Sequence, residues 1–168
     1  MSRDRQGSGR HDAPAMYGAW YCSRAAVSAV AEAVQYLRGH VLREVDFERT
    51  GGMTKALVAL DVADDLDMVD LDDPAELVAR RIRPSQVATM RRTVTQAIAV
   101  SVFRDGVVGM EWWSTLDAEW TNVTLFHERA LAGVSIVAPP RRLSLQLAEV
   151  QDAAQHLGIR LRARQGIR

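Results

Sequence analysis

The stretch TQAIAVSVFRDGVVGMEWWS, residues 95–114, passes from a helical pattern to a strand pattern. Its first part is apolar at helical spacing and belongs to a helix that we predict over residues 86–103. Asp105-Gly106 then predicts a turn, because glycine adopts backbone conformations that are strained for other residues. Residues 107–113 are short, apolar and aromatic, which is typical of a buried strand. The stretch therefore predicts a helix connected to a strand of a central sheet.

The flanking sequence adds helices and strands in mixed order. A helix is expected to begin near Ser23 and to end at Gly39, and another to begin at Pro74, after the acidic cap Asp72-Asp73, and to stop before Pro84. Further strands are predicted over residues 55–62 (largely buried), 66–71, 121–126 and 134–138, and a last helix over residues 143–157 before Gly158. Because strands and helices do not alternate regularly, we predict a single α+β domain with a mixed sheet and flanking helices.

The composition excludes several classes of protein. The chain has 168 residues, 48% of them hydrophobic, and a formal net charge of zero, so no overall field would steer it onto nucleic acid or an acidic membrane. The arginines after residue 159 are interpreted as a solvated basic tail. The single Cys22 excludes an internal disulfide, and no apolar run approaches the length of a membrane span. These features predict a cytoplasmic protein without direct nucleic-acid binding.

Several common catalytic and metal-binding motifs are absent from the sequence. It has no glycine-rich dinucleotide fingerprint, no phosphate-binding loop of the Walker type and no Gly-x-Ser-x-Gly. The four histidines are scattered, and the acidic run over residues 61–73 lacks the central glycine and the terminal glutamate of a calcium loop. We therefore predict no metal site.

One constellation of residues extends over most of the chain. It begins with Gly9-Arg10-His11-Asp12-Ala13-Pro14, and Tyr21 follows eleven residues after Arg10, with Glu32 eleven residues later. Ser114 ends the strand described above, and Asn122 stands at the start of the next predicted strand.

This constellation resembles the RES domain, a family named for its Arg, Glu and Ser. The matching positions are Gly9, Arg10, Pro14, Tyr21, Ser23, Ala29, Glu32, Thr95, Gln96, Asp105, Gly106, Ser114, Asn122 and Phe126. The resemblance implies a fold similar to that of ADP-ribosyltransferase toxins, and NAD as a substrate with no further cofactor. It also implies cleavage by water or phosphate, and neutralisation by an Xre-type helix-turn-helix antitoxin.

The chain departs from the family pattern in two places. His11-Asp12 stands where the family has an aromatic residue and Asn, and only eight residues precede Gly9, where the family usually has a strand with a further arginine. The resemblance thus implies either a truncated start or an incomplete site. It also suggests a flexible arm over residues 1–8, an NAD-binding catalytic domain over residues 9–138, and a C-terminal helix and tail over residues 139–168 packed on the same domain.

The resemblance gives each matched residue a role. Glu32 would stabilise the positive charge that develops on the ribose as the nicotinamide leaves. Arg10 would bind the diphosphate with its planar fork of donors. Tyr21 would present its ring to the nicotinamide, Ser114 would bind the ribose or hold Glu32, and Asn122 would help to bind NAD. We expect Arg10, Tyr21, Glu32 and Ser114 to converge on one cleft.

The expected function is that of a toxin that degrades NAD, as a glycohydrolase or a phosphorylase. Two alternatives remain open at this point. The same cleft could transfer ADP-ribose to a macromolecule, or the chain could be a non-catalytic binding module of the same fold. The sequence also leaves homo-oligomer formation open.

Overall fold

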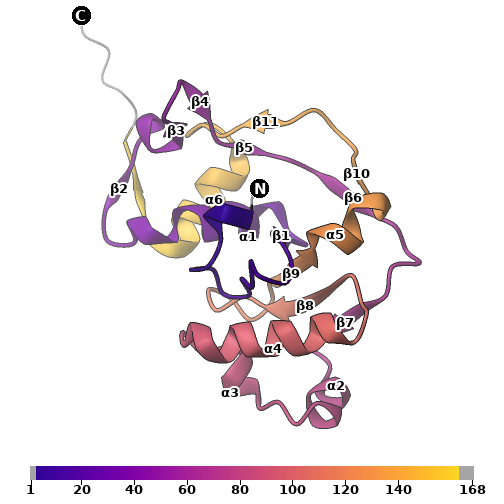
Figure 1. Ribbon diagram of the computed structural model, residues 1–168. Coiled ribbons are helices and arrows are strands. Elements are labelled where there is room, and N and C mark those ends of the chain that lie inside the picture. Colours follow the sequence, from indigo (N-terminus) through magenta and orange to yellow (C-terminus); the bar gives the residue numbers. More distant parts are fainter. Residues whose placement is uncertain (1–2, 163–168) are drawn as a thin grey trace, which may run out of the picture. The chain divides into compact units, whose positions relative to one another are not determined.

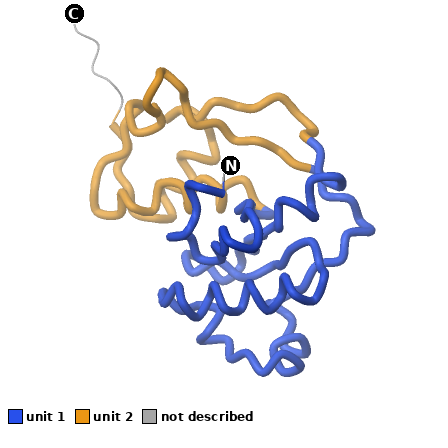
Figure 2. Tube along the Cα trace, viewed as in Figure 1, with its two compact units in different colours: residues 1–24, 61–135 blue, residues 25–60, 136–168 orange. Residues whose placement is uncertain are grey.

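The computed structural model describes residues 3–162 (Figure 1). The chain divides into two compact units, and each is built from two separate stretches of sequence (Figure 2). Unit 1 comprises Met1–Arg24 and Asp61–Ser135, and unit 2 comprises Ala25–Leu60 and Ile136–Arg168. The last residues of the predicted basic tail, including Arg164 and Arg168, lie outside the described residues. No helix within residues 3–162 is long and apolar enough to cross a membrane.

Unit 1 is built on a four-stranded sheet with the strand order β1-β9-β8-β7. The strands are β1 (Ala19–Ser23), β7 (Met68–Asp70), β8 (Gly109–Trp113) and β9 (Thr121–Phe126). β9 pairs antiparallel with both β1 and β8, whereas β7 pairs parallel with β8. The sheet is therefore mixed, and the predicted α+β class is confirmed.

The parallel pair β7 and β8 is joined by three helices, because parallel neighbours cannot be joined by a tight hairpin. These helices are α2 (Pro74–Ala79), α3 (Pro84–Val87) and α4 (Arg92–Arg104). As predicted, α2 begins at a proline, and the Asp73 carboxylate caps it by accepting a hydrogen bond from the Ala75 N–H at 2.8 Å. α4 ends before Gly106, whose φ of 93° confirms the predicted turn.

The predicted continuous helix over residues 86–103 is wrong, because the chain breaks between α3 and α4. The Thr89 hydroxyl accepts a hydrogen bond from the Arg91 N–H at 3.2 Å, a local bond that competes with helix formation. The carbonyls of Val87 and Thr89 accept hydrogen bonds from the Arg10 side chain. Part of the backbone hydrogen bonding of this segment is thus supplied by a residue that is distant in the sequence.

The two faces of the sheet are covered by different groups of apolar residues. On one face, Ala19, Met110, Trp112 and Phe126 pack with Tyr17 and with the buried residues of α4. On the other face, Val123 and Leu125 pack with Ala130 of α5 (His127–Ala130) and with the partly buried Trp20 and Cys22. Alternation along each strand therefore places Trp112, Thr124 and Tyr21 on the face that is covered by α4.

Unit 2 contains two longer helices, α1 (Ala26–Val34) and α6 (Ala148–Leu157), which pack against each other. α6 ends at Gly158 with a φ of 65°, as the sequence predicted. Short strands pair around these helices: β2 (Val41–Leu42) with β12 (Arg160–Leu161), β3 (Glu48–Arg49) with β4 (Met53–Thr54), and β5 (Ala56–Leu57) with β11 (Arg141–Arg142).

Three predicted boundaries are wrong. Ser23 ends β1, and the following helix begins only at Ala26. The predicted buried strand over residues 55–62 is split into β5 and β6 (Leu60–Val62), and most of its residues are exposed, because each strand pairs with one short partner instead of entering a central sheet. The final helix starts at Ala148, five residues later than predicted.

The predicted strands over 66–71 and 134–138 are present as the shorter β7 and β10 (Val134–Ile136), and β10 pairs with β6.

Candidate functional site

The Asp12 carboxylate lies at the centre of a hydrogen-bonded loop in unit 1. Its Oδ2 accepts hydrogen bonds from the backbone N–H groups of Gly7 and Gly9, both at 2.7 Å, and its Oδ1 accepts one from the Tyr21 hydroxyl at 2.7 Å. The same hydroxyl accepts a hydrogen bond from the His11 N–H at 2.8 Å. We call these five residues, Gly7, Gly9, His11, Asp12 and Tyr21, the Asp12 cluster.

Gly9 is required for this arrangement on steric grounds. A Cβ atom at this position would lie 2.5 Å from Asp12 Oδ1 and 2.6 Å from the Tyr21 hydroxyl oxygen. Both distances are far below a van der Waals contact. The glycine that precedes Arg10 in the motif is thus explained by the close approach of two side chains.

Tyr21 is partly exposed, and its hydroxyl is hydrogen-bonded to His11 and Asp12. The residue is 45% exposed, and its ring stacks at 6.2 Å on that of His11. Burial, followed by the hydrogen bond to Asp12, raises the pKa of the Tyr21 phenol well above its ordinary value. The hydroxyl therefore stays protonated at neutral pH and acts as a fixed link between His11 and Asp12.

Arg10 is buried, with 8% of its surface exposed. Its Nη1 donates to the carbonyl of Val87 at 2.9 Å and to that of Thr89 at 2.8 Å. Its guanidinium carbon lies 5.1 Å from the centre of the Trp112 ring, which is a favourable position for a cation–π contact. The guanidinium is therefore a fixed positive charge beneath the loop, with its Nη1 bound to two backbone carbonyls and its Nη2 lying 3.9 Å from the Met90 sulfur.

His11 is buried on the same face of the sheet, with 2% exposed. Its Nδ1 hydrogen-bonds with the Thr124 hydroxyl at 2.8 Å, and that hydroxyl also accepts a hydrogen bond from Trp112 Nε1 at 3.1 Å. Burial lowers the pKa of the imidazole well below its ordinary value, and the positive charges of Arg10 and Arg92 lower it further. His11 is therefore neutral at pH 7.

Ser114 and Asn122 are buried near one end of the sheet, and each is 2% exposed. The Ser114 hydroxyl oxygen accepts a hydrogen bond from the Leu116 N–H at 3.1 Å, which stabilises the turn after β8. The Asn122 side-chain oxygen accepts a hydrogen bond from the Ser23 hydroxyl at 2.6 Å, and the two residues lie opposite each other in β9 and β1. These contacts give both residues a structural role.

Glu32 lies on α1 in unit 2 and is partly buried. Its Oε2 accepts a hydrogen bond from Gln35 Nε2 at 2.6 Å, one turn further along the chain. The structure thus links Tyr21 to the backbone of the residue after Arg10, and places Ser114 and Asn122 at one end of the same sheet. The convergence of Glu32 with these residues stays a prediction.

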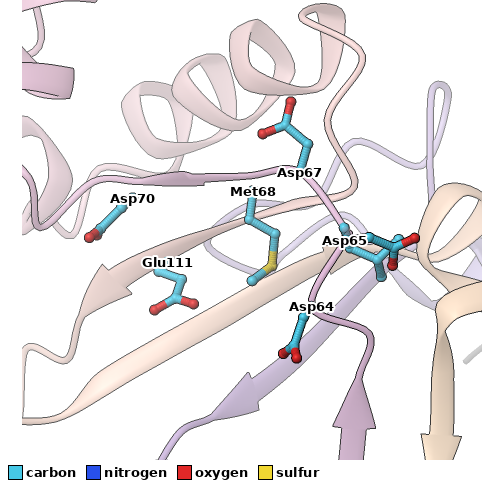
Figure 3. Close-up of a pocket in the computed structure, with 7 residues that line it drawn as sticks. Asp64, Asp65, Asp67, Met68, Asp70 and Glu111 are labelled. Carbon is cyan, nitrogen blue, oxygen red and sulfur yellow. The ribbon is translucent and has the colours of Figure 1, made fainter.

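A second feature of unit 1 is an acidic pocket at the edge of the sheet that carries β7 (Figure 3). Its lining residues are Asp64, Asp65, Leu66, Asp67, Met68, Asp70 and Glu111. Asp70 and Glu111 lie opposite each other in β7 and β8, and Glu111 forms an ion pair with Arg24. Within residues 3–162 no group of three or more His, Cys, Asp or Glu side chains is arranged to hold a metal ion.

The roles of His11, Asp12 and Thr124 were not predicted from the sequence. A signal was present for Asp12, because aspartate side chains in turns often accept hydrogen bonds from neighbouring backbone N–H groups. The role of Thr124 depends on the strand face, which the pairing of β9 with β8 decides.

Comparison with known proteins supports the family assignment. The model of the RES domain matches residues 2–148, which is most of the chain. The search of curated proteins and the search of solved structures found no match. The RES match contains both Arg10 and Tyr21, together with Glu32, Ser114 and Asn122. The chain therefore belongs to the RES domain family.

Proposed function

We propose that this protein cleaves the nicotinamide–ribose bond of NAD, with water or phosphate as the acceptor. In this proposal it is the toxin of a toxin–antitoxin pair, and an Xre-type helix-turn-helix protein neutralises it. The observation that carries the proposal is the Asp12 cluster, in which the half-exposed Tyr21 is hydrogen-bonded to the loop that follows the buried Arg10, within a chain of the RES family.

In this proposal Tyr21 provides a surface that contacts the substrate, and it takes no part in proton transfer. Its hydroxyl already donates to Asp12 and accepts from His11, and the pKa of the phenol is raised. The exposed part of the ring offers an apolar surface on which the planar nicotinamide can stack. Arg10 adds a positive charge that attracts the negatively charged substrate.

Glu32 supplies the electrostatic part of the reaction. As the bond between ribose C1′ and the nicotinamide nitrogen breaks, its electron pair leaves with the nicotinamide, and positive charge develops on the ribose. A carboxylate held by the Gln35 side chain can stabilise that charge. An oxygen of water or phosphate then bonds to C1′, and in the case of water a proton is released to the solvent.

The test is the release of nicotinamide from NAD by the purified chain, measured by chromatography with and without phosphate. Glu32→Gln keeps the shape of the side chain and removes its charge, so we expect a rate about 10²–10³-fold lower, or about 3–4 kcal/mol. The melting temperature should stay nearly unchanged. Glu48→Gln is the matched control, because Glu48 is an exposed glutamate of the same unit.

Two outcomes would contradict the proposal. Equal rates for the parent chain and Glu32→Gln would refute the role of Glu32. A chain that consumes no NAD, with or without phosphate, would refute the enzymatic function. If radiolabel from the adenylate part of NAD becomes attached to protein or nucleic acid, the acceptor is a macromolecule.

A further inference from the structure

Arg92, the first residue of α4, has a buried donor without an acceptor. Its Nη1 is buried, and no described residue accepts a hydrogen bond from it. Arg92 also takes part in none of the ion pairs formed between described residues. A buried charged donor without a partner is costly, and a bound ion or water is a common explanation for such a group.

The first turn of α4 packs on the loop that holds Arg10. The Thr95 hydroxyl, one turn after Arg92, donates a hydrogen bond to the Arg10 carbonyl and also lies 3.4 Å from the Arg92 carbonyl. Gln96 Nε2 donates to the Gly9 carbonyl at 3.0 Å. The Arg10 side chain, in turn, is bound to the carbonyls of Val87 and Thr89, just before α4.

The loop that carries Arg10 also carries the buried, neutral His11, so the first turn of α4 packs beside both residues. Both Arg10 and Arg92 lower the pKa of His11, as expected for positive charges nearby. The carboxylate of this region, Asp12, is already bound to two backbone N–H groups and to Tyr21. Arg92 is also partly exposed as a residue, so that its surroundings can be reached from solvent.

We infer that Arg92, with Arg10 beside it, binds a phosphate group. A phosphate group carries the negative charge and the several acceptor oxygens that two neighbouring guanidinium groups require. Within the proposed function, on which this identification of the ligand rests, the group is either the diphosphate of NAD or the free phosphate that acts as acceptor. The binding of phosphate itself does not depend on turnover.

The test is direct binding of inorganic phosphate, pyrophosphate and ADP to the full chain, measured by calorimetry and by the shift in melting temperature. We expect Arg92→Gln to weaken the binding of the preferred anion at least tenfold, and Arg92→Lys to restore it only in part, because an ammonium group does not bind two oxygens in a fixed plane. Arg104→Gln, an exposed arginine at the other end of α4, is the matched control and should bind as the parent chain does.

The unliganded melting temperature separates binding from a structural role. Because Arg92→Gln removes an unsatisfied buried donor, its unliganded melting temperature should not fall below that of the parent chain. A clear fall in both Arg92 variants would overturn the inference, and so would equal binding by Arg92→Gln and the parent chain, or no binding of any of the three anions by the parent chain.

The same set of measurements identifies the source of the phosphate group. Tighter binding of pyrophosphate and ADP indicates the diphosphate of the dinucleotide, whereas tighter binding of inorganic phosphate indicates the acceptor. Anion binding that depends on Arg92 in a chain that consumes no NAD would support this site and refute the proposed reaction. NAD consumption with an unchanged KM for both substrates in Arg92→Gln would refute this site and leave the reaction in place.

Discussion

Replacing Tyr21 by Phe removes one oxygen atom that joins two parts of the Asp12 cluster. The hydroxyl donates to the Asp12 carboxylate at 2.7 Å and accepts from the His11 N–H at 2.8 Å. A hydrogen bond to a charged group contributes about 1.5–3 kcal/mol, and a buried N–H without an acceptor costs about 1–3 kcal/mol. Because Tyr21 is partly exposed, water can replace some of these contacts, and we expect a loss of about 2–4 kcal/mol in the free energy of unfolding.

Tyr17→Phe is the matched control for this change. The Tyr17 hydroxyl is buried, and it donates one hydrogen bond, at 2.8 Å, to the His11 carbonyl. Its removal leaves a neutral acceptor, so the expected loss is about 1 kcal/mol. Urea unfolding followed by tryptophan fluorescence measures both variants. Equal losses for the two variants, or a loss below about 1 kcal/mol for Tyr21→Phe, would refute the assignment of Tyr21 as the link between a carboxylate and a buried N–H.

Two further predictions concern the same loop. Gly9→Ala should lower the free energy of unfolding by more than about 2 kcal/mol, because its new Cβ would lie 2.5 Å from Asp12 Oδ1; an unchanged urea midpoint would contradict this close approach. His11 should make the protein less stable in mild acid. Below about pH 6.5 the unfolded imidazole gains a proton that the buried one does not, so stability falls by up to about 1.4 kcal/mol per pH unit until the pH reaches the lowered pKa of the folded state. Melting temperatures from pH 7.5 to 5 should therefore fall more steeply for the parent chain than for His11→Phe, and parallel curves would disprove this account.

The elements that depend on local residues were predicted well from the sequence. The Asp73 cap, the turn at Gly106 and the end of the last helix at Gly158 all follow from the conformational preferences of those residues and are confirmed. The break between α3 and α4 was not predicted, because part of its cause is a hydrogen-bonding side chain, Arg10, some eighty positions away in the sequence. The apolar run over residues 55–62 was expected to be buried, but burial depends on whether a strand joins the central sheet, which hydropathy does not encode.

The candidate site was predictable in part. The spacing of the family motif identified Arg10 and Tyr21, and the structure places both around one loop. The motif did not predict that the Tyr21 hydroxyl and part of the Arg10 guanidinium would form hydrogen bonds within the protein. Arg92 gave no sequence signal, because an arginine at the start of a helix is common on solvated surfaces. Arg92 is distinguished only by the structure, in which its buried Nη1 has no acceptor among the described residues.

The position of β1 in the sheet has a consequence for the order of folding. Ala19 of β1 pairs with Phe126 of β9, more than a hundred residues further along the chain, whereas β7, the three helices, β8 and β9 follow one another closely. Contacts between distant segments form late, because closing a long loop costs chain entropy before any contact is gained. During synthesis, β1 cannot pair with β9 until β9 has emerged from the ribosome. We therefore expect residues 7–23, which include the Asp12 cluster, to dock on the sheet last in unit 1, when most of the protein has been made.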